Sequence, residues 1–166
     1  MRFFVPANVP VAMSGRFQEN PGGAVTDTRT GLMWQQGFAY QETGNYFTWF
    51  EANAYVARLN ARRLGGHADW RMPHKLEIMS LYLMEQWIDF RGRRLRVRLD
   101  PAFEFGYGSS FWTWRERLSG ALAFQFDAGE ARWFPKASAA ATVRAVRLEQ
   151  NPFKLLVPGG GIIHGA

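Results

Sequence analysis

The chain has 166 residues, of which 47% are hydrophobic and 16% aromatic, and it carries a net charge of +6 without any cysteine. This length and aromatic content favour one domain with a ring-rich core and exclude a disordered chain. The lack of cysteine excludes disulfides and thiolate chemistry, while the basic balance favours anionic partners such as acidic glycan, anionic lipid, nucleic acid or an acidic protein face.

Both ends of the chain are predicted to be extended arms, because prolines and glycines interrupt otherwise apolar segments in residues 1–14 and 150–166. Pro6 and Pro10 break the first apolar run before it reaches the length of a signal peptide. No window approaches the roughly 18 apolar residues of a membrane helix. We therefore expect no membrane span, and either a cytoplasmic location or a place in a phage-like or secreted particle.

The body of the domain, residues 15–149, is predicted to begin with a β-hairpin. Residues 24–27 and 32–35 have the composition of two short strands. The polar link between them, residues 28–31, ends in a glycine, as a hairpin turn requires.

A helix is predicted to follow from Thr48, because Thr48 and Glu51 have the spacing of a capping box. Gly65 and Gly66 are expected to stop it. Three- and four-residue steps give one candidate face of Phe50, Ala54, Ala57 and Arg58, and a second pair of Tyr55 and Leu59.

A second helix is predicted from about Pro73, where a missing amide is harmless, to about Trp87. After Asp89 the pattern changes to a period of two, which is typical of a strand. In this strand Leu95, Val97 and Leu99 alternate with Arg94, Arg96 and Arg98.

Further strands are predicted at residues 111–114, 121–126, 131–134 and 143–148, with a tight hairpin at residues 127–130. The sequence therefore predicts an α+β fold in which two helices pack on a twisted, mostly antiparallel sheet between extended N- and C-terminal arms.

The chain resembles the Lcl C-terminal domain family, within the wider group of C-type-lectin-like and formylglycine-generating-enzyme-like folds. The resemblance is carried by short motifs in the family's order. They are Gly15-Arg16-Phe17, Val25-Thr26-Asp27, Thr30-Gly31-Leu32-Met33-Trp34, Thr48-Trp49, Glu51-Ala52, Leu59-Asn60, Gly65-Gly66, Asp69-Trp70-Arg71 with Pro73, Glu77 with Ser80-Leu81, Asp100-Pro101-Ala102-Phe103, Phe111-Trp112-Thr113 and Val143-Arg144-Ala145-Val146-Arg147.

The resemblance implies a single compact C-type-lectin-like domain of the kind found in bacterial surface and phage-like proteins. For the best-known member of the family it implies trimerisation and binding of sulfated glycans. The family often carries a cysteine where this chain has Ala145.

The strongest charge feature is a set of five arginines within eight residues, whose guanidinium groups can grip phosphate, sulfate or carboxylate. The alternatives are an edge strand that charge protects from aggregation, or a strand that meets an acidic partner protein. The arginines are Arg91, Arg93, Arg94, Arg96 and Arg98.

No catalytic or metal-binding set is recognisable. The histidines, His67, His74 and His164, do not have the spacing of metal ligands, and no nucleophile elbow or phosphate-binding loop is present. Trp70 is predicted to be core, with Asp69 and Arg71 fixing its loop. Most aromatic residues of the late strands are expected to be core as well, with the outward ones available for a sugar or protein contact.

We therefore predict a non-enzymatic subunit for protein–protein assembly, either in a larger assembly or as a homo-oligomer, without cofactor or metal. Its apolar arms and exposed aromatic residues would be the docking elements. The alternative is a lectin-like binder of acidic glycans or other polyanions through residues 91–98, and nucleic acid is not expected. The predicted docking residues of the arms are Phe3, Phe4, Val5, Phe153, Leu155, Leu156, Ile162 and Ile163.

Overall fold

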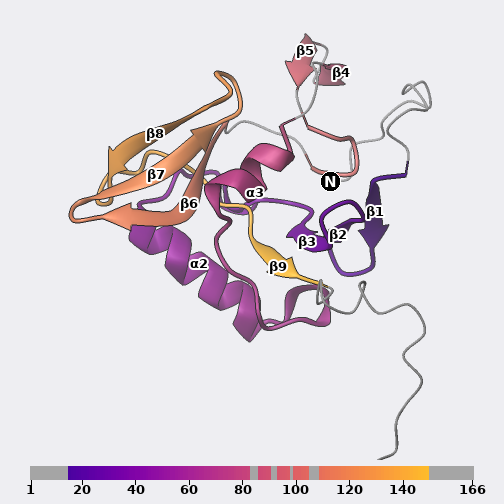
Figure 1. The fold of residues 1–166 in the computed structure, drawn as a ribbon, viewed down its shortest axis with the longest axis horizontal. Helices are drawn as coiled ribbons and strands as arrows, with labels where there is room; N and C mark the ends of the chain where they lie inside the picture. The colour runs from indigo at the N-terminus through magenta and orange to yellow at the C-terminus, as the bar shows by residue number, and fades with distance from the viewer. Residues whose placement is uncertain (1–14, 83–85, 91–92, 98, 105–108, 150–166) are drawn as a thin grey trace, which may run out of the picture.

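The computed structural model describes residues 15–82, 86–90, 93–97, 99–104 and 109–149. Within this part of the chain the protein is α+β, and its strands pair antiparallel in three sheets (Figure 1). Both predicted arms lie outside the described residues. The expectation of one twisted sheet is wrong, because the strands divide among separate sheets.

The first sheet has the order β1-β2-β3-β9 and joins the two ends of the described chain. It consists of β1 (Phe17–Asn20), β2 (Ala24–Asp27), β3 (Leu32–Gln35) and β9 (Val146–Leu148). The predicted hairpin of β2 and β3 is confirmed, and its turn ends at Gly31 with a φ of 70°, which suits a residue without a Cβ. Strand β1 was not predicted.

The second sheet is a hairpin of β4 (Gln86–Phe90) and β5 (Arg93–Val97). The third sheet has the order β6-β7-β8 and contains β6 (Ser110–Arg117), β7 (Gly120–Gln125) and β8 (Glu130–Pro135). The predicted strands at these places are confirmed, as is the tight turn between β7 and β8.

Helix α2 (Trp49–Ala61) begins with the predicted capping box. Thr48 Oγ1 accepts from the Glu51 amide at 3.1 Å, and a Glu51 side-chain oxygen accepts from the Thr48 amide at 2.7 Å. Two orphan amides of the first turn are thereby satisfied. The shorter helix α1 (Ala39–Thr43) precedes α2 and was not predicted.

The buried face of α2 includes the predicted pair Tyr55 and Leu59, together with Ala52 and Val56. The other candidate face is wrong as a core face. Phe50 is 57% exposed, and Ala54, Ala57 and Arg58 are exposed as well. The helix has two possible apolar stripes, and the one that contains Tyr55 and Leu59 packs with the residues of the third sheet.

Helix α3 (Lys75–Ser80) ends well before Trp87, which lies in β4, so the predicted long second helix is wrong. The Ser80 carbonyl, which a longer helix would use, instead accepts from the Arg16 guanidinium at 3.2 Å. The amides of Leu81 and Tyr82 bond three residues back and tighten the last turn.

Residues 141–146 form a fully buried connection between the first and third sheets. Thr142 exchanges backbone hydrogen bonds with Ser110 and Trp112 of β6, whereas the carbonyl of Ala145 accepts from the amide of Gln35 in β3. Because the partners change along the segment, only its end pairs as a strand. The predicted strand at residues 143–148 is therefore shortened to β9.

The core lies on both faces of the third sheet. On one face, α2 packs with Trp112 and the alanines of β7, and in Figure 1 it runs beneath this sheet. On the other face, Ile78 and Leu81 pack with Phe111 and Phe124. The large aromatic content of the chain is thus mostly buried, which holds the sheet rigidly between its neighbours.

Candidate functional site

A groove of about 710 Å³ lies between α2, the segment that leads into α3, and β6. Its walls are largely aromatic and aliphatic, and they come from parts of the chain that are more than 60 residues apart. The apolar lining residues are Trp49, Val56, Ala57, Trp70, Met72 and Trp114.

Trp114 is the exposed aromatic wall of this groove, with 51% of its surface accessible. Its ring centroid lies 4.8 Å from that of His74, which also lines the groove. Phe50, next to Trp49 on α2, and Leu76 on α3 are also exposed. Phe50 belongs to the candidate face of α2 that the structure leaves exposed, and neither Leu76 nor Trp114 was singled out from the sequence.

Most polar residues of the groove are already bonded within the protein. Asn60 accepts from the Trp70 amide at 2.7 Å and donates to the Trp70 carbonyl at 2.9 Å. Asn53 donates to the Trp49 carbonyl at 2.9 Å, and Glu116 forms an ion pair with Lys136. These groups shape the groove and leave little convergent hydrogen-bonding capacity inside it.

Two ion pairs fix the loop that contains Trp70, which is buried as predicted. Asp69 accepts from Arg147 at 2.6 Å, and this hydrogen bond with the Arg147 charge lowers the pKa of Asp69. Arg71 donates to both oxygens of Glu77, at 2.7 and 2.8 Å. Burial alone would raise the pKa of Glu77, but its bonds to Arg71 and the His74 amide bring it below its ordinary value. Both arginines therefore act structurally.

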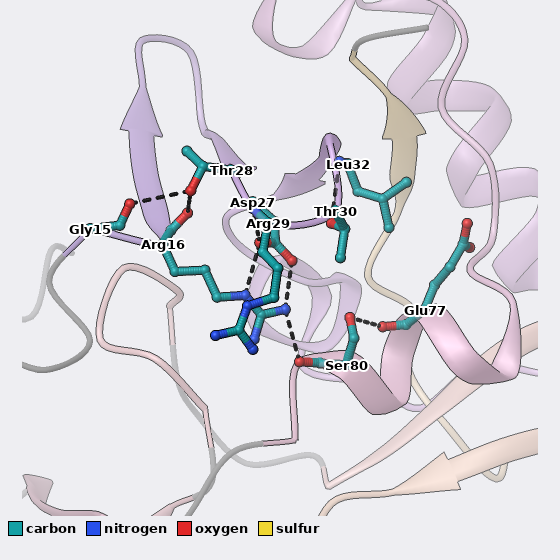
Figure 2. A network of polar contacts seen from close by, with 9 residues as sticks. All are labelled: Gly15, Arg16, Asp27, Thr28, Arg29, Thr30, Leu32, Glu77 and Ser80. Atoms are coloured by element: carbon teal, nitrogen blue, oxygen red, sulfur yellow. Dashed lines mark hydrogen bonds and ion pairs between the residues drawn. The ribbon is translucent and has the colours of Figure 1, made fainter. Parts of the chain in front are cut away.

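A second polar cluster joins the first sheet to α3 (Figure 2). Arg16 grips the buried Asp27 through two hydrogen bonds of 2.8 and 2.6 Å and reaches the Ser80 carbonyl. The amide of Arg29 adds a bond to Asp27 at 3.0 Å. Burial favours a raised pKa of Asp27, yet the hydrogen bonds and the Arg16 charge outweigh it and lower the pKa. In this cluster Arg16 and Asp27 are bonded to each other and to backbone, and their bonds hold the first sheet against α3.

Arg144 is buried without an acidic partner among the described residues. Burial lowers its pKa to about 9, so it remains protonated at neutral pH. Its guanidinium donates to three carbonyls and is surrounded by three rings. The carbonyls belong to Gln35, Gln36 and Glu104, and the rings to Phe38, Phe103 and Phe111.

The predicted docking and polyanion residues stay predictions. Arg91 and Arg98 lie outside the described residues. Arg93, Arg94 and Arg96 lie on β5, where the structure describes the strand and not the side chains. The arm residues Phe3, Phe4, Val5, Phe153, Leu155, Leu156, Ile162 and Ile163 lie outside the described residues as well.

Across the described ranges, no group of three or more histidine, aspartate or glutamate side chains is placed to hold a metal ion. His67 and His74 each contact a tryptophan ring, those of Trp70 and Trp114 respectively. None of the helices in the described residues has the length and hydropathy needed to cross a bilayer.

Comparison with curated proteins gives no match to this chain. The family model of the Lcl C-terminal domain matches residues 23–147. This range begins before β2 and ends within β9, so it includes α2, the Trp70 loop, α3 and the whole third sheet. The chain belongs to the Lcl C-terminal domain family.

Proposed function

We propose that this chain is a non-enzymatic assembly subunit, built on a C-type-lectin-like domain, that binds an apolar segment of another protein chain in the groove between α2 and β6. The half-exposed Trp114 in the groove wall carries this proposal. Exposed tryptophans beside a preformed apolar hollow are typical of binding hot spots.

The state of the polar groups supports contact in preference to catalysis. A catalytic site needs an acid, base or nucleophile with a free position aimed at the substrate. In this groove the amides of Asn53 and Asn60 bond to backbone, and the charged groups of Arg71 and Glu116 have ion-pair partners. The hollow is therefore suited to receiving apolar side chains.

The occupant that we propose is the C-terminal arm, residues 150–166, of a neighbouring copy. The arm offers Phe153, Leu155 and Leu156 as apolar anchors. An arm that occupied the groove of its own copy would leave the chain monomeric. The oligomeric state therefore distinguishes a neighbouring copy from the same copy as the source of the arm.

The proposal predicts that Trp114→Asp weakens self-association by about 30-fold or more, the loss expected for one hot-spot tryptophan. Phe153→Asp should weaken it similarly, because it changes the other partner of the same contact. The measurement is the molar mass by sedimentation equilibrium across a dilution series, starting from the 19.0 kDa of one chain.

Leu118→Asn is the matched control, since Leu118 is an exposed apolar residue outside the groove. It should leave the association unchanged. A wild-type chain that stays monomeric at every concentration would contradict the proposal. So would an oligomer that tolerates both Trp114→Asp and Phe153→Asp.

A further inference from the structure

The turn between β6 and β7 has an unusual residue at its tip. Arg117 pairs with Gly120, so Leu118 and Ser119 form a two-residue hairpin turn. Leu118 has a φ of 29° and is 99% exposed. Such turns favour glycine, asparagine or aspartate, because a bulky side chain is strained at positive φ. The leucine gains no packing within the domain to offset this strain.

Two arginines flank this tip without acidic partners in the described part of the chain. The guanidinium of Arg117 lies 4.1 Å from the centre of the Trp133 ring, and that of Arg115 lies 6.0 Å from it. Both arginines are exposed. The nearby Glu116 is already paired with Lys136, so the charges of Arg115 and Arg117 are not compensated locally.

Arg115, Arg117 and Trp133 lie on the face of the third sheet that is turned away from α2 and the groove. Trp133 pairs with Leu122 across the strands, whereas the next residue, Phe134, packs against Trp112 in the cluster that includes α2. In Figure 1 the β6–β7 end of this sheet is the outermost point on its side of the molecule. The tip can therefore contact another surface while the groove remains accessible.

We propose that this tip, formed by Arg115, Arg117, Leu118 and Trp133, docks onto an anionic lipid surface. The order of its groups matches the depth profile of a bilayer interface. The apolar leucine is outermost and can enter the acyl boundary, while the arginines and the indole, set further back, suit the phosphate and headgroup region. Basic residues near an anionic membrane add electrostatic attraction.

A lipid surface fits these observations better than an acidic protein partner. A projecting tip needs no complementary pocket on a bilayer, whereas a protein would have to offer a hollow for Leu118 and carboxylates at fixed places around it. Arg117 lies over the Trp133 ring and is exposed, so its guanidinium can donate to a phosphate oxygen. Tip contact and groove contact involve different residues, so the two proposals stand or fall separately.

The test is co-sedimentation of the full chain with phosphatidylcholine vesicles that contain about one-third phosphatidylserine, at an ionic strength of about 0.1 M. The wild-type chain should bind these vesicles and leave pure phosphatidylcholine vesicles unoccupied. Leu118→Asn should reduce the partition coefficient about tenfold, since it removes the leucine side chain that would enter the acyl boundary. Its melting temperature should be equal or higher, because asparagine tolerates positive φ.

The double variant Arg115→Gln with Arg117→Gln should lose binding by at least tenfold. The matched control, Arg29→Gln with Arg58→Gln, removes the same charge from two exposed positions away from the tip and should retain most of the binding. No binding by the wild type, unchanged binding by Leu118→Asn, or an equal loss in the control double variant would each overturn the proposal. Salt-sensitive retention on poly-L-glutamate without vesicle binding would assign the tip to an acidic polypeptide and overturn it as well.

Discussion

At the scale of single residues, two buried cationic contacts hold distant parts of the chain together by different means. Arg144 has only carbonyl oxygens and aromatic faces around its charge, whereas Arg16 meets the carboxylate of Asp27. Arg144 reaches its three carbonyls through two nitrogens of a flat, forked group, an arrangement that an ammonium does not reproduce. Both contacts are therefore specific to the side chains present.

Arg144→Ala is expected to lower the free energy of unfolding by about 3–5 kcal/mol, because it leaves buried carbonyls unpaired and opens a cavity between three rings. Arg144→Lys should recover only part of this loss. Urea denaturation followed by tryptophan fluorescence measures both. Arg132→Ala is a suitable control, since Arg132 is exposed and should change stability by no more than about 0.5 kcal/mol. A stable Arg144→Ala variant would show that the carbonyls find other partners.

The pKa of Asp27 is lowered in the folded protein, so its pair with Arg16 contributes stability above the unfolded pKa of about 3.9 and loses it as the pH falls through the folded value. The free energy of unfolding should therefore decline below about pH 4. The double variant Arg16→Gln with Asp27→Asn should flatten this decline, since it keeps hydrogen-bonding groups and removes the titrating carboxylate. Thermal melts between neutral pH and pH 2 provide the measurement. Equal slopes for both proteins would assign the acid sensitivity to other carboxylates.

At the scale of elements, local chemistry predicted the parts whose signals are local. The capping box of Thr48 and Glu51 and the glycine of the β2–β3 turn act within four residues, and the structure has both. The end of α3 could not be predicted, because it depends on Arg16, which lies 64 residues away in sequence from Ser80. Hydrogen bonds between residues so far apart produce no periodic pattern in the sequence.

For the candidate groove, the sequence indicated properties of single residues and not how these residues come together. The core position of Trp70 followed from its motif, whereas alternation in β6 puts Trp114 on the side of the buried Trp112 and did not indicate its exposure. The choice of face on α2, which exposes Phe50, depends on how the third sheet packs over the helix. Side chains from α2, the Trp70 loop and β6 meet only when the whole domain has folded, so no local pattern indicates the groove.

At the scale of the molecule, the sequence suggested a single continuous sheet, but the structure has separate sheets, and residues 141–146 connect two of them. Along the segment, the backbone forms hydrogen bonds in turn with that of Phe47, Ser110, Ala39, Gln35 and Arg71. A regular strand would bond to one or two neighbours along its length, whereas this segment connects several elements at one or two residues each. It thereby links the first and third sheets.

Truncation tests this role. A chain that ends at residue 149 keeps every backbone bond of the connection and should unfold cooperatively. A chain that ends at residue 140 loses the connection and β9, and it should lack a cooperative thermal transition. Near-ultraviolet circular dichroism distinguishes fixed aromatic packing from its loss. A cooperative melt of the shorter chain would show that the first and third sheets can hold together without residues 141–146.

The position of this connection near the end of the chain has a consequence for biosynthesis. During translation, the first hairpin, α2 and the third sheet emerge before the backbone that completes them. Their apolar faces stay exposed to solvent until residue 146 has left the ribosome. During this time the nascent chain can bind chaperones or aggregate. Premature termination anywhere before that residue should yield a product destined for degradation.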